Sequence, residues 1–242
     1  GFGSEVNNLI SAAILCQEKG LSCVVQDEVW NSGRLHVYLQ AEPWLLKRCP
    51  HEGRCRPLEV KRDKRVATPG WFAVCKHANG VPFKTKSQFM RKVWTYTGET
   101  QKRISILNKE LGLPESYVAV QIRRGDKIAG KRKESLEVTA EDYVRAALTH
   151  ISPQCNVIVV CTDDLSAAEE VRDMVKRRDS KVDVRYRSRQ DIPEELRNGH
   201  WQASYNSLKP KDRTAMTHEF LADVEVLRRA TVCICTYSSN VG

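Results

Sequence analysis

Long hydrophobic runs are missing from this sequence. The longest apolar stretches are Ile10–Cys16, interrupted by Ser11, and Val157–Cys161, and both fall far short of the roughly 20 residues that span a bilayer. Internal repeats and low-complexity tracts are also absent. With 41% hydrophobic and 29% charged residues, the composition excludes a disordered, collagenous or coiled-coil protein. The sequence is that of a globular protein, and its 242 residues favour two domains.

The sequence has no Met at its start, since the first residue is Gly1, and Gly242 follows soon after a strand-like apolar run. We interpret it as a fragment. The absence of a leader or anchor is then uninformative about the whole protein.

Standard zinc-binding spacings are missing, although nine cysteines are present. Cys49 and Cys55 flank a short polar loop that a disulfide would close, with Cys75 as a rival partner. A zinc site that includes His51 and His77 is the alternative. Five further cysteines lie in apolar elements, where we expect small buried hydrophobes: Cys16, Cys155, Cys161, Cys233 and Cys235. The number of cysteines alone leaves the redox compartment open.

Nucleic-acid-reading modules are absent as well, although the chain is basic, with a formal charge of +9. No helix-turn-helix, zinc-finger or RNA-recognition signature accompanies this charge, so we expect no nucleic-acid partner. Residues 1–115 hold 18 basic and 11 acidic residues, and the densest basic run is Lys61–Arg65. The basic residues of this half either form a solvated face or attract an anionic substrate or a membrane surface.

The two halves of the chain differ in pattern. The first half is predicted to begin with a helix that has Ser4 as N-cap, ends at Gly20 and carries the apolar residues Val6, Leu9, Ile10, Ala13 and Ile14. A strand Leu21–Val25, an irregular proline-rich stretch 43–93 and a helix Glu99–Leu111 are predicted to follow. The strands predicted in the second half are Tyr117–Ile122, Asn156–Cys161, Val182–Tyr186 and Thr231–Cys235, with helices Thr139–Ile151, Ser166–Lys176 and Thr214–Arg229 between them. Such alternation is typical of a parallel sheet covered on both faces, the doubly wound α/β architecture.

Ligands of such sheets bind beyond the carboxyl ends of the strands. Polar runs follow three of the predicted strands: Arg123-Arg124-Gly125-Asp126-Lys127, Thr162-Asp163-Asp164 and Thr236-Tyr237-Ser238-Ser239-Asn240. Because adjacent residues alternate faces, either Arg123 or Arg124 can hold a phosphate while the other braces the fold. The alternative is a surface ion pair between an arginine and Asp126.

The other polar residues each have two interpretations. Asp163 and Asp164 either accept hydrogen bonds from a sugar or base, or cap the following helix, for which Asp164 is well placed. Ser238 and Ser239 either cradle a phosphate with backbone N–H groups or cap a further helix. Asp223 borders the apolar stripe of its helix, where it either orients an arginine or is a partly exposed helix acid.

In this order, Val120–Lys127, Cys161–Asp164, and Asp223 with Cys235–Val241 resemble the donor-site motifs of the α-1,6-fucosyltransferase family. The opening Gly1-Phe2-Gly3 is similar to the turn at the start of that family's catalytic region. The resemblance implies a GT-B architecture, with two Rossmann-like domains whose sheets are mainly parallel and doubly wound. We place the acceptor-side domain at residues 1–112 and the donor-binding domain at residues 113–242.

The resemblance also implies roles for individual residues. Arg123 would hold the β-phosphate, Glu134 would be the base with Glu137 in reserve, and Asp223 would brace Arg123. Donor-binding roles fall on Arg124, Asp126, Lys127, Tyr143, Asp163, Asp164, Ser238, Ser239 and Asn240. The chain departs from the family pattern at two positions: Gln121 replaces the usual His, and Gly125 stands where the family's best-known member has Thr.

The prediction is therefore an inverting fucosyltransferase that moves fucose from GDP-fucose to a glycan hydroxyl without a metal or other cofactor. The resemblance implies α-1,6 linkage to the GlcNAc of an N-glycan or chito-oligosaccharide, on a glycan or glycoprotein acceptor. It also implies that the protein is located in the Golgi lumen, as a type II membrane protein whose anchor lies outside this fragment. The alternatives are a protein O-fucosyltransferase, a non-catalytic nucleotide-sugar or glycan-binding module, and a polyanion binder built on the basic first half.

Overall fold

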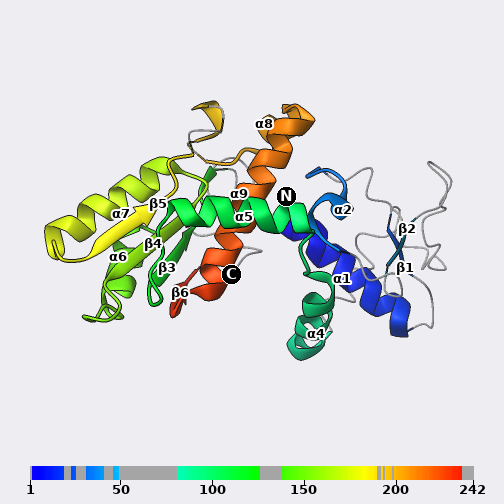
Figure 1. Cartoon of the computed structure of the whole chain (residues 1–242), viewed down its shortest axis with the longest axis horizontal. Helices are drawn as coiled ribbons and strands as arrows, with labels where there is room; N and C mark the ends of the chain where they lie inside the picture. Colours follow the sequence, from blue (N-terminus) through cyan, green and yellow to red (C-terminus); the bar gives the residue numbers. More distant parts are fainter. Residues whose placement is uncertain are drawn as a thin grey trace. The chain divides into compact units, whose positions relative to one another are not determined.

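Two compact units, Gly1–Gln101 and Lys102–Gly242, make up the chain (Figure 1). The computed structural model describes residues 2–18, 23–25, 31–40, 46–48, 81–125, 138–189, 192, 194–197 and 199–235. The division between the units falls inside helix α5 (Gly98–Glu110), ahead of the boundary predicted at residue 112. The acceptor-side and donor-side roles of the two domains stay predictions.

The first unit is built on helix α1 (Phe2–Glu18). Its predicted apolar positions are all buried in the core: Val6, Leu9, Ile10, Ala13 and Ile14. Strand β1 (Cys23–Val25) pairs in parallel with β2 (Leu46–Arg48), and the short helix α2 (Leu35–Tyr38) buries its first and last residues. The prediction that Ser4 caps α1 is wrong, because the helix begins at Phe2 and Ser4 lies within it.

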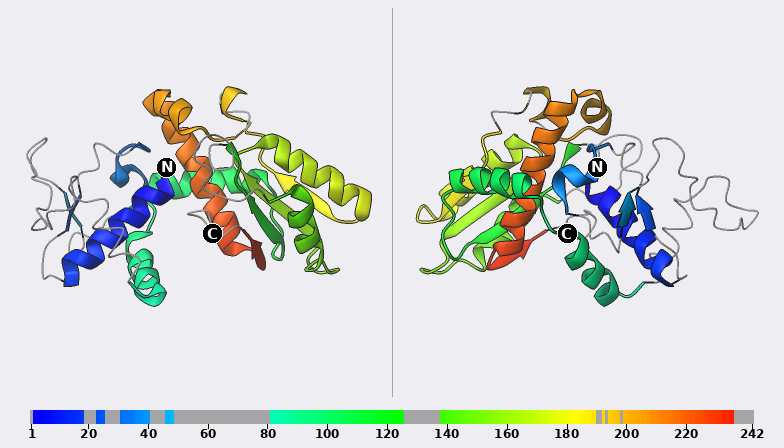
Figure 2. Two further views of the ribbon diagram at one scale, coloured as in Figure 1. Left: turned by 180° about the vertical axis from the view of Figure 1, so that it is seen from behind. Right: turned by 45° about the vertical axis from the view of Figure 1, so that its right-hand side comes forward.

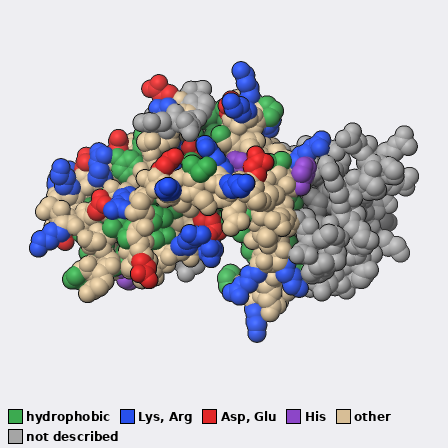
Figure 3. Space-filling model, in the orientation of Figure 1, with side chains coloured by type: hydrophobic (Ala, Val, Ile, Leu, Met, Phe, Trp, Pro, Cys, Tyr) green, Lys and Arg blue, Asp and Glu red, His purple; other side chains and the backbone are tan. Residues whose placement is uncertain are grey.

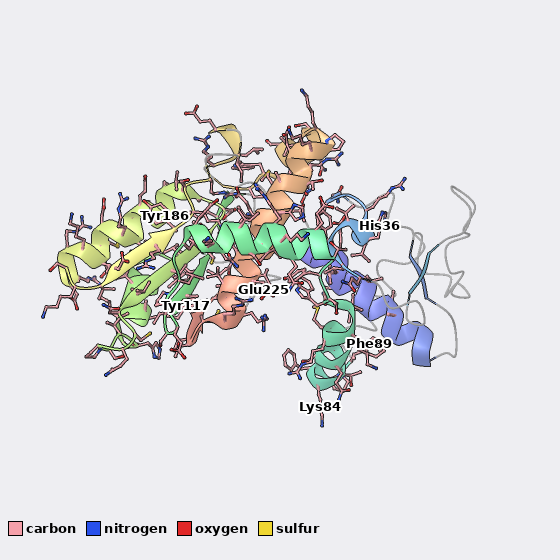
Figure 4. All side chains as sticks on the ribbon, in the orientation of Figure 1. His36, Lys84, Phe89, Tyr117, Tyr186 and Glu225 are labelled. Carbon is pink, nitrogen blue, oxygen red and sulfur yellow. The ribbon has the colours of Figure 1, made fainter. Side chains whose placement is uncertain are left out.

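Helix α4 (Phe83–Val93) corrects the prediction that residues 43–93 are irregular. It begins directly after Pro82 and buries Phe89 and Val93, which lie one turn apart, and it contacts α1. Its charged residues are all basic, namely Lys84, Lys86, Arg91 and Lys92. Figure 3 shows Lys and Arg side chains gathered over this helix, and Figure 4 labels Lys84 and Phe89 on it. Its apolar residues Phe89, Met90 and Val93 follow helical spacing, but the prolines before them, of which Pro82 is the last, led the whole stretch to be predicted irregular.

The second unit contains the predicted parallel sheet. Its strands are β3 (Val118–Ile122), β4 (Val157–Thr162), β5 (Asp183–Tyr186) and β6 (Val232–Ile234), in the order β5-β4-β3-β6. Every neighbouring pair is parallel, so the carboxyl ends of all four strands lie at one edge. The predicted α/β class with a parallel sheet is confirmed.

Helices cover both faces of this sheet (Figure 2). On one face, α6 (Ala140–Leu148) and α7 (Leu165–Arg178) pack on side chains that include Val118, Val120 and Ile158. On the other face, α9 (Pro210–Arg229) packs on the alternate residues of β3 and β4, among them Ala119 and Val159. β3 is buried at all five positions, as the central strand of a doubly wound sheet requires.

Local signals explain where the helices begin. The Thr139 hydroxyl accepts the Asp142 N–H at 3.2 Å and caps α6. Helix α9 begins four residues before the predicted Thr214, with Pro210 at its first position, where proline costs no hydrogen bond. The turn η3 (Glu194–Leu196) and helix α8 (Gln202–Ser207) fill the stretch before α9, and neither was predicted.

Candidate functional site

The carboxyl edge of the parallel sheet gathers the predicted site residues that the structure describes, except Tyr143 on α6. Arg123 and Arg124 follow β3, Asp163 and Asp164 follow β4, and Asp223 lies on α9. Seven other candidates lie outside the described residues: Asp126, Lys127, Glu134, Glu137, Ser238, Ser239 and Asn240.

Asp163 is the centre of a hydrogen-bond network at this edge. Its Oδ1 accepts the backbone N–H of Arg124 at 2.9 Å, and its Oδ2 accepts the backbone N–H of His200 at 2.9 Å. Oδ2 also accepts a hydrogen bond from the Arg123 guanidinium. The Asp163 backbone carbonyl accepts a hydrogen bond from the Gly199 N–H at 3.0 Å. One carboxylate therefore fixes both the arginine and the loop that faces it.

The expectation that Asp223 braces Arg123 stays a prediction, and the structure pairs Arg123 with Asp163. The reason lies in the register of the sheet. Ile122 of β3 pairs with Thr162 of β4, so the residues that follow them are neighbours across the two strand ends. Asp223 is paired with a different arginine, Arg187.

The two adjacent arginines turn to different partners. Arg123 binds Asp163, whereas Arg124 donates to both carboxylate oxygens of Glu170 on α7, at 2.7 and 3.2 Å. The Arg124 guanidinium lowers the pKa of Glu170. Arg124 therefore braces the sheet against α7, and Arg123 is the better candidate for a ligand's phosphate.

Asp164 caps helix α7, as one interpretation of the sequence expected. Its Oδ1 accepts the Ser166 backbone N–H at 3.0 Å and the Ser166 hydroxyl at 2.6 Å. Only 8% of Asp164 is exposed. Its described contacts therefore account for it as a structural residue, and its role toward the donor stays a prediction.

Gly125 explains one departure from the family pattern. It has φ +70°, and a Cβ at this position would stand 2.4 Å from the His200 carbonyl oxygen and 2.8 Å from the His200 nitrogen. Gly199, with φ +98°, meets the Gly125 backbone from the other side of the contact. Two backbones approach too closely here for any side chain, so a threonine would not fit.

Gln121 and Tyr143 are both buried. Gln121 on β3 is 7% exposed, and its Oε1 has no hydrogen-bond partner among the described residues. Tyr143 on α6 is 5% exposed and belongs to the core between α6, α7 and the sheet. The donor-binding role of Tyr143 stays a prediction.

A second polar cluster, formed by Arg187, Arg189, Glu219 and Asp223, lies at the ends of β4 and β5, and only Asp223 of it was expected from the sequence. It lines a small pocket formed by Val160, Thr162, Tyr186, Arg187, Arg189, Glu219 and Asp223. Figure 4 labels Tyr186 on β5. Arg187 donates from Nε to Asp223 Oδ1 at 2.9 Å. Burial raises the pKa of Asp223, while Arg187 and Arg189 oppose that rise.

Arg189 sits in the same pocket in a strained conformation. Its φ is +54°, in the left-handed region that non-glycine residues seldom adopt. Its Nη1 donates to the Thr162 carbonyl at 3.2 Å, and its Nε lies 3.5 Å from Glu219 Oε2. Strain of this kind persists where surrounding contacts enforce it, and it is typical of ligand sites.

The missed residues had a detectable signal. Arg187 and Arg189 follow the third predicted strand, Val182–Tyr186. The rule that ligands bind beyond strand ends applies to this strand as much as to the other three. Glu219 gave no such signal, because it lies within a helix and reaches the pocket only through the packing of α9.

The part of the chain that the structure describes has neither a metal-binding cluster nor a membrane-spanning helix. No group of three or more His, Cys, Asp or Glu side chains there is arranged to hold a metal ion. No helix within the same residues has both the length and the hydrophobicity needed to cross a membrane.

Comparisons with known proteins give matches in structure only. No protein-family model and no curated protein matches the chain. Fucosyltransferase NodZ from Bradyrhizobium matches with a TM-score of 0.62 and 13% identity, over 100% of this chain and 87% of that one. The chain has the GT-B fold of NodZ.

Two further NodZ structures agree. NodZ α-1,6-fucosyltransferase soaked with GDP-fucose matches with a TM-score of 0.61, and NodZ co-crystallised with GDP with a TM-score of 0.57. Both are 13% identical to this chain and cover 100% of it. The predicted GT-B fold class is thereby confirmed.

Proposed function

We propose that this protein is a GDP-fucose-dependent fucosyltransferase. The observation that carries the proposal is Arg123, fixed by Asp163 at the carboxyl edge of the sheet, in a fold shared with an enzyme crystallised with GDP and with GDP-fucose. A nucleotide-sugar transferase needs a fixed positive charge where the nucleoside diphosphate departs. An arginine is suited to that task, because it stays charged and matches phosphate geometry.

The second cluster has the chemistry to hold the nucleotide's base. The carboxylates of Glu219 and Asp223 accept hydrogen bonds and Arg189 donates them, whereas Arg187 donates to protein acceptors. Guanine presents N–H groups on one edge and the acceptors O6 and N7 on another, and arginine is the usual partner of those acceptors. We therefore assign the base to this pocket and the diphosphate to Arg123.

In the proposed reaction, an acceptor hydroxyl attacks the anomeric carbon of fucose and the bond from that carbon to the β-phosphate breaks, with inversion. Glu134 takes the hydroxyl proton as general base. Arg123 stabilises the negative charge that grows on the departing GDP. Because Arg123 supplies this charge, we propose that the reaction needs no metal.

The acceptor proposed is a glycan, with transfer in α-1,6 linkage to the GlcNAc of an N-glycan or chito-oligosaccharide. This rests on the three sequence motifs and on the likeness to NodZ. The proposed location is the Golgi lumen, for a protein held by an N-terminal anchor.

GDP binding measured by calorimetry in EDTA tests the donor site. In the full natural chain, Arg123→Ala should weaken GDP binding roughly 10- to 100-fold, because it removes charge-assisted hydrogen bonds to phosphate. It should also abolish fucose transfer, followed as a mass increase of a chito-oligosaccharide. Arg145→Ala is the control, since the Arg145 side chain is 72% exposed on α6.

Wild-type affinity in the Arg123→Ala variant would contradict the role of this arginine. A folded wild-type chain that binds no GDP would contradict the function itself.

A further inference from the structure

Arg187 is a buried cation with three acceptors of different origin. Its side chain is 8% exposed. Nε donates to Asp223 Oδ1 at 2.9 Å, Nη1 to the Leu107 carbonyl at 2.5 Å, and Nη2 to Asn108 Oδ1 at 2.6 Å. A guanidinium is rigid and planar, so three such bonds fix its position.

These acceptors belong to two helices. Asp223 lies on α9, whereas Leu107 and Asn108 lie in the last turn of α5. The Leu107 carbonyl is among the last four of α5, which have no partner within the helix. A cation is favourable at this end because the helix dipole is negative there. Arg187 therefore joins the end of α5 to the carboxylate in the pocket.

We propose that Arg187 is a positioning residue for nucleotide binding: it holds the Asp223 carboxylate ionised and correctly oriented for the N–H groups of the base. The inference rests on the proposed function, since it deepens the assignment of the base to this pocket. Arg187 acts through Asp223, whose second oxygen carries no described hydrogen bond from Arg187 and is the atom we assign to the ligand.

The groups around Asp223 determine how its charge responds to pH. Arg187 and Arg189 face it from the end of β5, the Cys161 thiol faces it from β4, and Glu219 lies one turn earlier on α9. Burial raises the pKa of the Cys161 thiol well above its usual value, so the thiol stays neutral. The two arginines are therefore the groups that keep Asp223 ionised against the effect of burial.

Arg185 provides a matched control. It lies on β5, two residues before Arg187, and its Nη1 donates to the carbonyls of Leu111 and Gly112 just beyond α5. Its Nε binds Asp183 at 2.7 Å, and no described contact joins it to Asp223. Arg185→Met thus removes an arginine that holds the end of α5 while leaving the Asp223 pair in place.

The test is GDP binding by calorimetry between pH 5.5 and 8, with the wild type, Arg187→Met, Arg187→Lys and Arg185→Met. Arg187→Met should weaken GDP binding roughly tenfold at pH 7. The loss should shrink as the pH rises, because Asp223 without Arg187 ionises only at higher pH. Arg187→Lys keeps the positive charge but loses the planar guanidinium. It should therefore bind GDP less tightly than the wild type, with a pH profile close to the wild-type one. Arg185→Met should bind like the wild type.

Several outcomes would overturn the proposal. They are wild-type affinity of Arg187→Met at every pH, a loss that does not change with pH, and an equal loss in Arg185→Met. If Arg187→Met does not fold, a wild-type affinity and pH profile of Arg187→Lys would overturn the claim that the three-acceptor geometry matters. Absence of GDP binding by the wild type overturns the proposed function instead.

Discussion

At the scale of single residues, the backbone contact between Gly125 and His200 determines which residues can occupy position 125. Gly125→Ala places a Cβ 2.4 Å from the His200 carbonyl oxygen, at φ +70°. We expect a loss of roughly 1–3 kcal/mol in the free energy of unfolding. GDP binding should also weaken, because displacement of His200 disturbs its hydrogen bond to Asp163. Urea unfolding measures the first effect and calorimetry the second.

Gly98→Ala is the control for this change. Gly98 begins α5, and nothing lies within 4 Å of a Cβ built there. The alanine should be neutral or should stabilise the protein by up to about 1 kcal/mol. An equal loss of stability in both variants would show that the contact with His200 is not the cause.

The sequence identified some site residues and missed others for a physical reason. Arg123 and Asp163 could be found because each directly follows an apolar strand. Their pairing with each other, and that of Asp223 with Arg187, depends on the register of β3 with β4 and on how α9 packs. Neither of these is encoded in the neighbourhood of any one residue.

At the scale of secondary-structure elements, the cap of α7 is the clearest test. Asp164→Ala should lower the free energy of unfolding by about 1 kcal/mol, within the range of 0.5–2 for lost caps. Asp164→Ser should restore most of it, since a serine hydroxyl also accepts from the first turn. Asp173→Ala, at an exposed position in the middle of α7, should change the stability by less than about 0.5 kcal/mol. Urea unfolding of the three variants checks this.

Helices and strands were predictable where the pattern of apolar residues along the sequence was strong. Strands β3, β4 and β6 are almost uninterrupted apolar runs, and β5 alternates charged and apolar residues. The structure has each strand within a few residues of its predicted bounds. Helix α4 was missed because the proline-rich stretch before it was predicted to be irregular as far as residue 93, although Pro82 directly precedes the helix. The early start of α9 was missed although Pro210 marked it, because the prediction followed the apolar stripe and not the start signal.

At the scale of the whole molecule, the link between the sheet and α9 predicts how stability falls at high pH. The Tyr117 hydroxyl donates to the Val226 carbonyl on α9 at 2.8 Å, and burial raises the pKa of Tyr117 to about 12. Tyrosine in the unfolded chain ionises near pH 10. The stabilisation of the folded state by the neutral Tyr117 hydroxyl is therefore complete below pH 10 and is lost as the pH rises toward 12. The loss in the free energy of unfolding is on the order of 2–3 kcal/mol.

Urea unfolding of the wild type and Tyr117→Phe between pH 8 and 11.5 measures this contribution. The wild type should be the more stable protein at pH 8, and its advantage should shrink and then reverse as the pH rises toward 11.5, because the buried Tyr117 hydroxyl resists ionisation and phenylalanine has no ionisable group. A difference that is constant over this range would assign the high-pH loss to other groups. At pH 8, loss of the hydrogen bond alone should cost the variant roughly 1 kcal/mol.

Helix α5 has a practical consequence for exchanging parts between enzymes of this fold. At its first turn, the Thr100 hydroxyl donates to the Val37 carbonyl at 3.1 Å, and at its last turn Arg187 donates to Leu107 and Asn108. A chimaera joined at residue 101 would keep each of these contacts within one parent, because Thr100 and Val37 lie before the junction and Leu107, Asn108 and Arg187 lie after it. A junction before Gly98 would instead transplant α5 whole with Arg187, but it would set Thr100 of one parent against residue 37 of the other, so the junction at residue 101 disturbs fewer contacts.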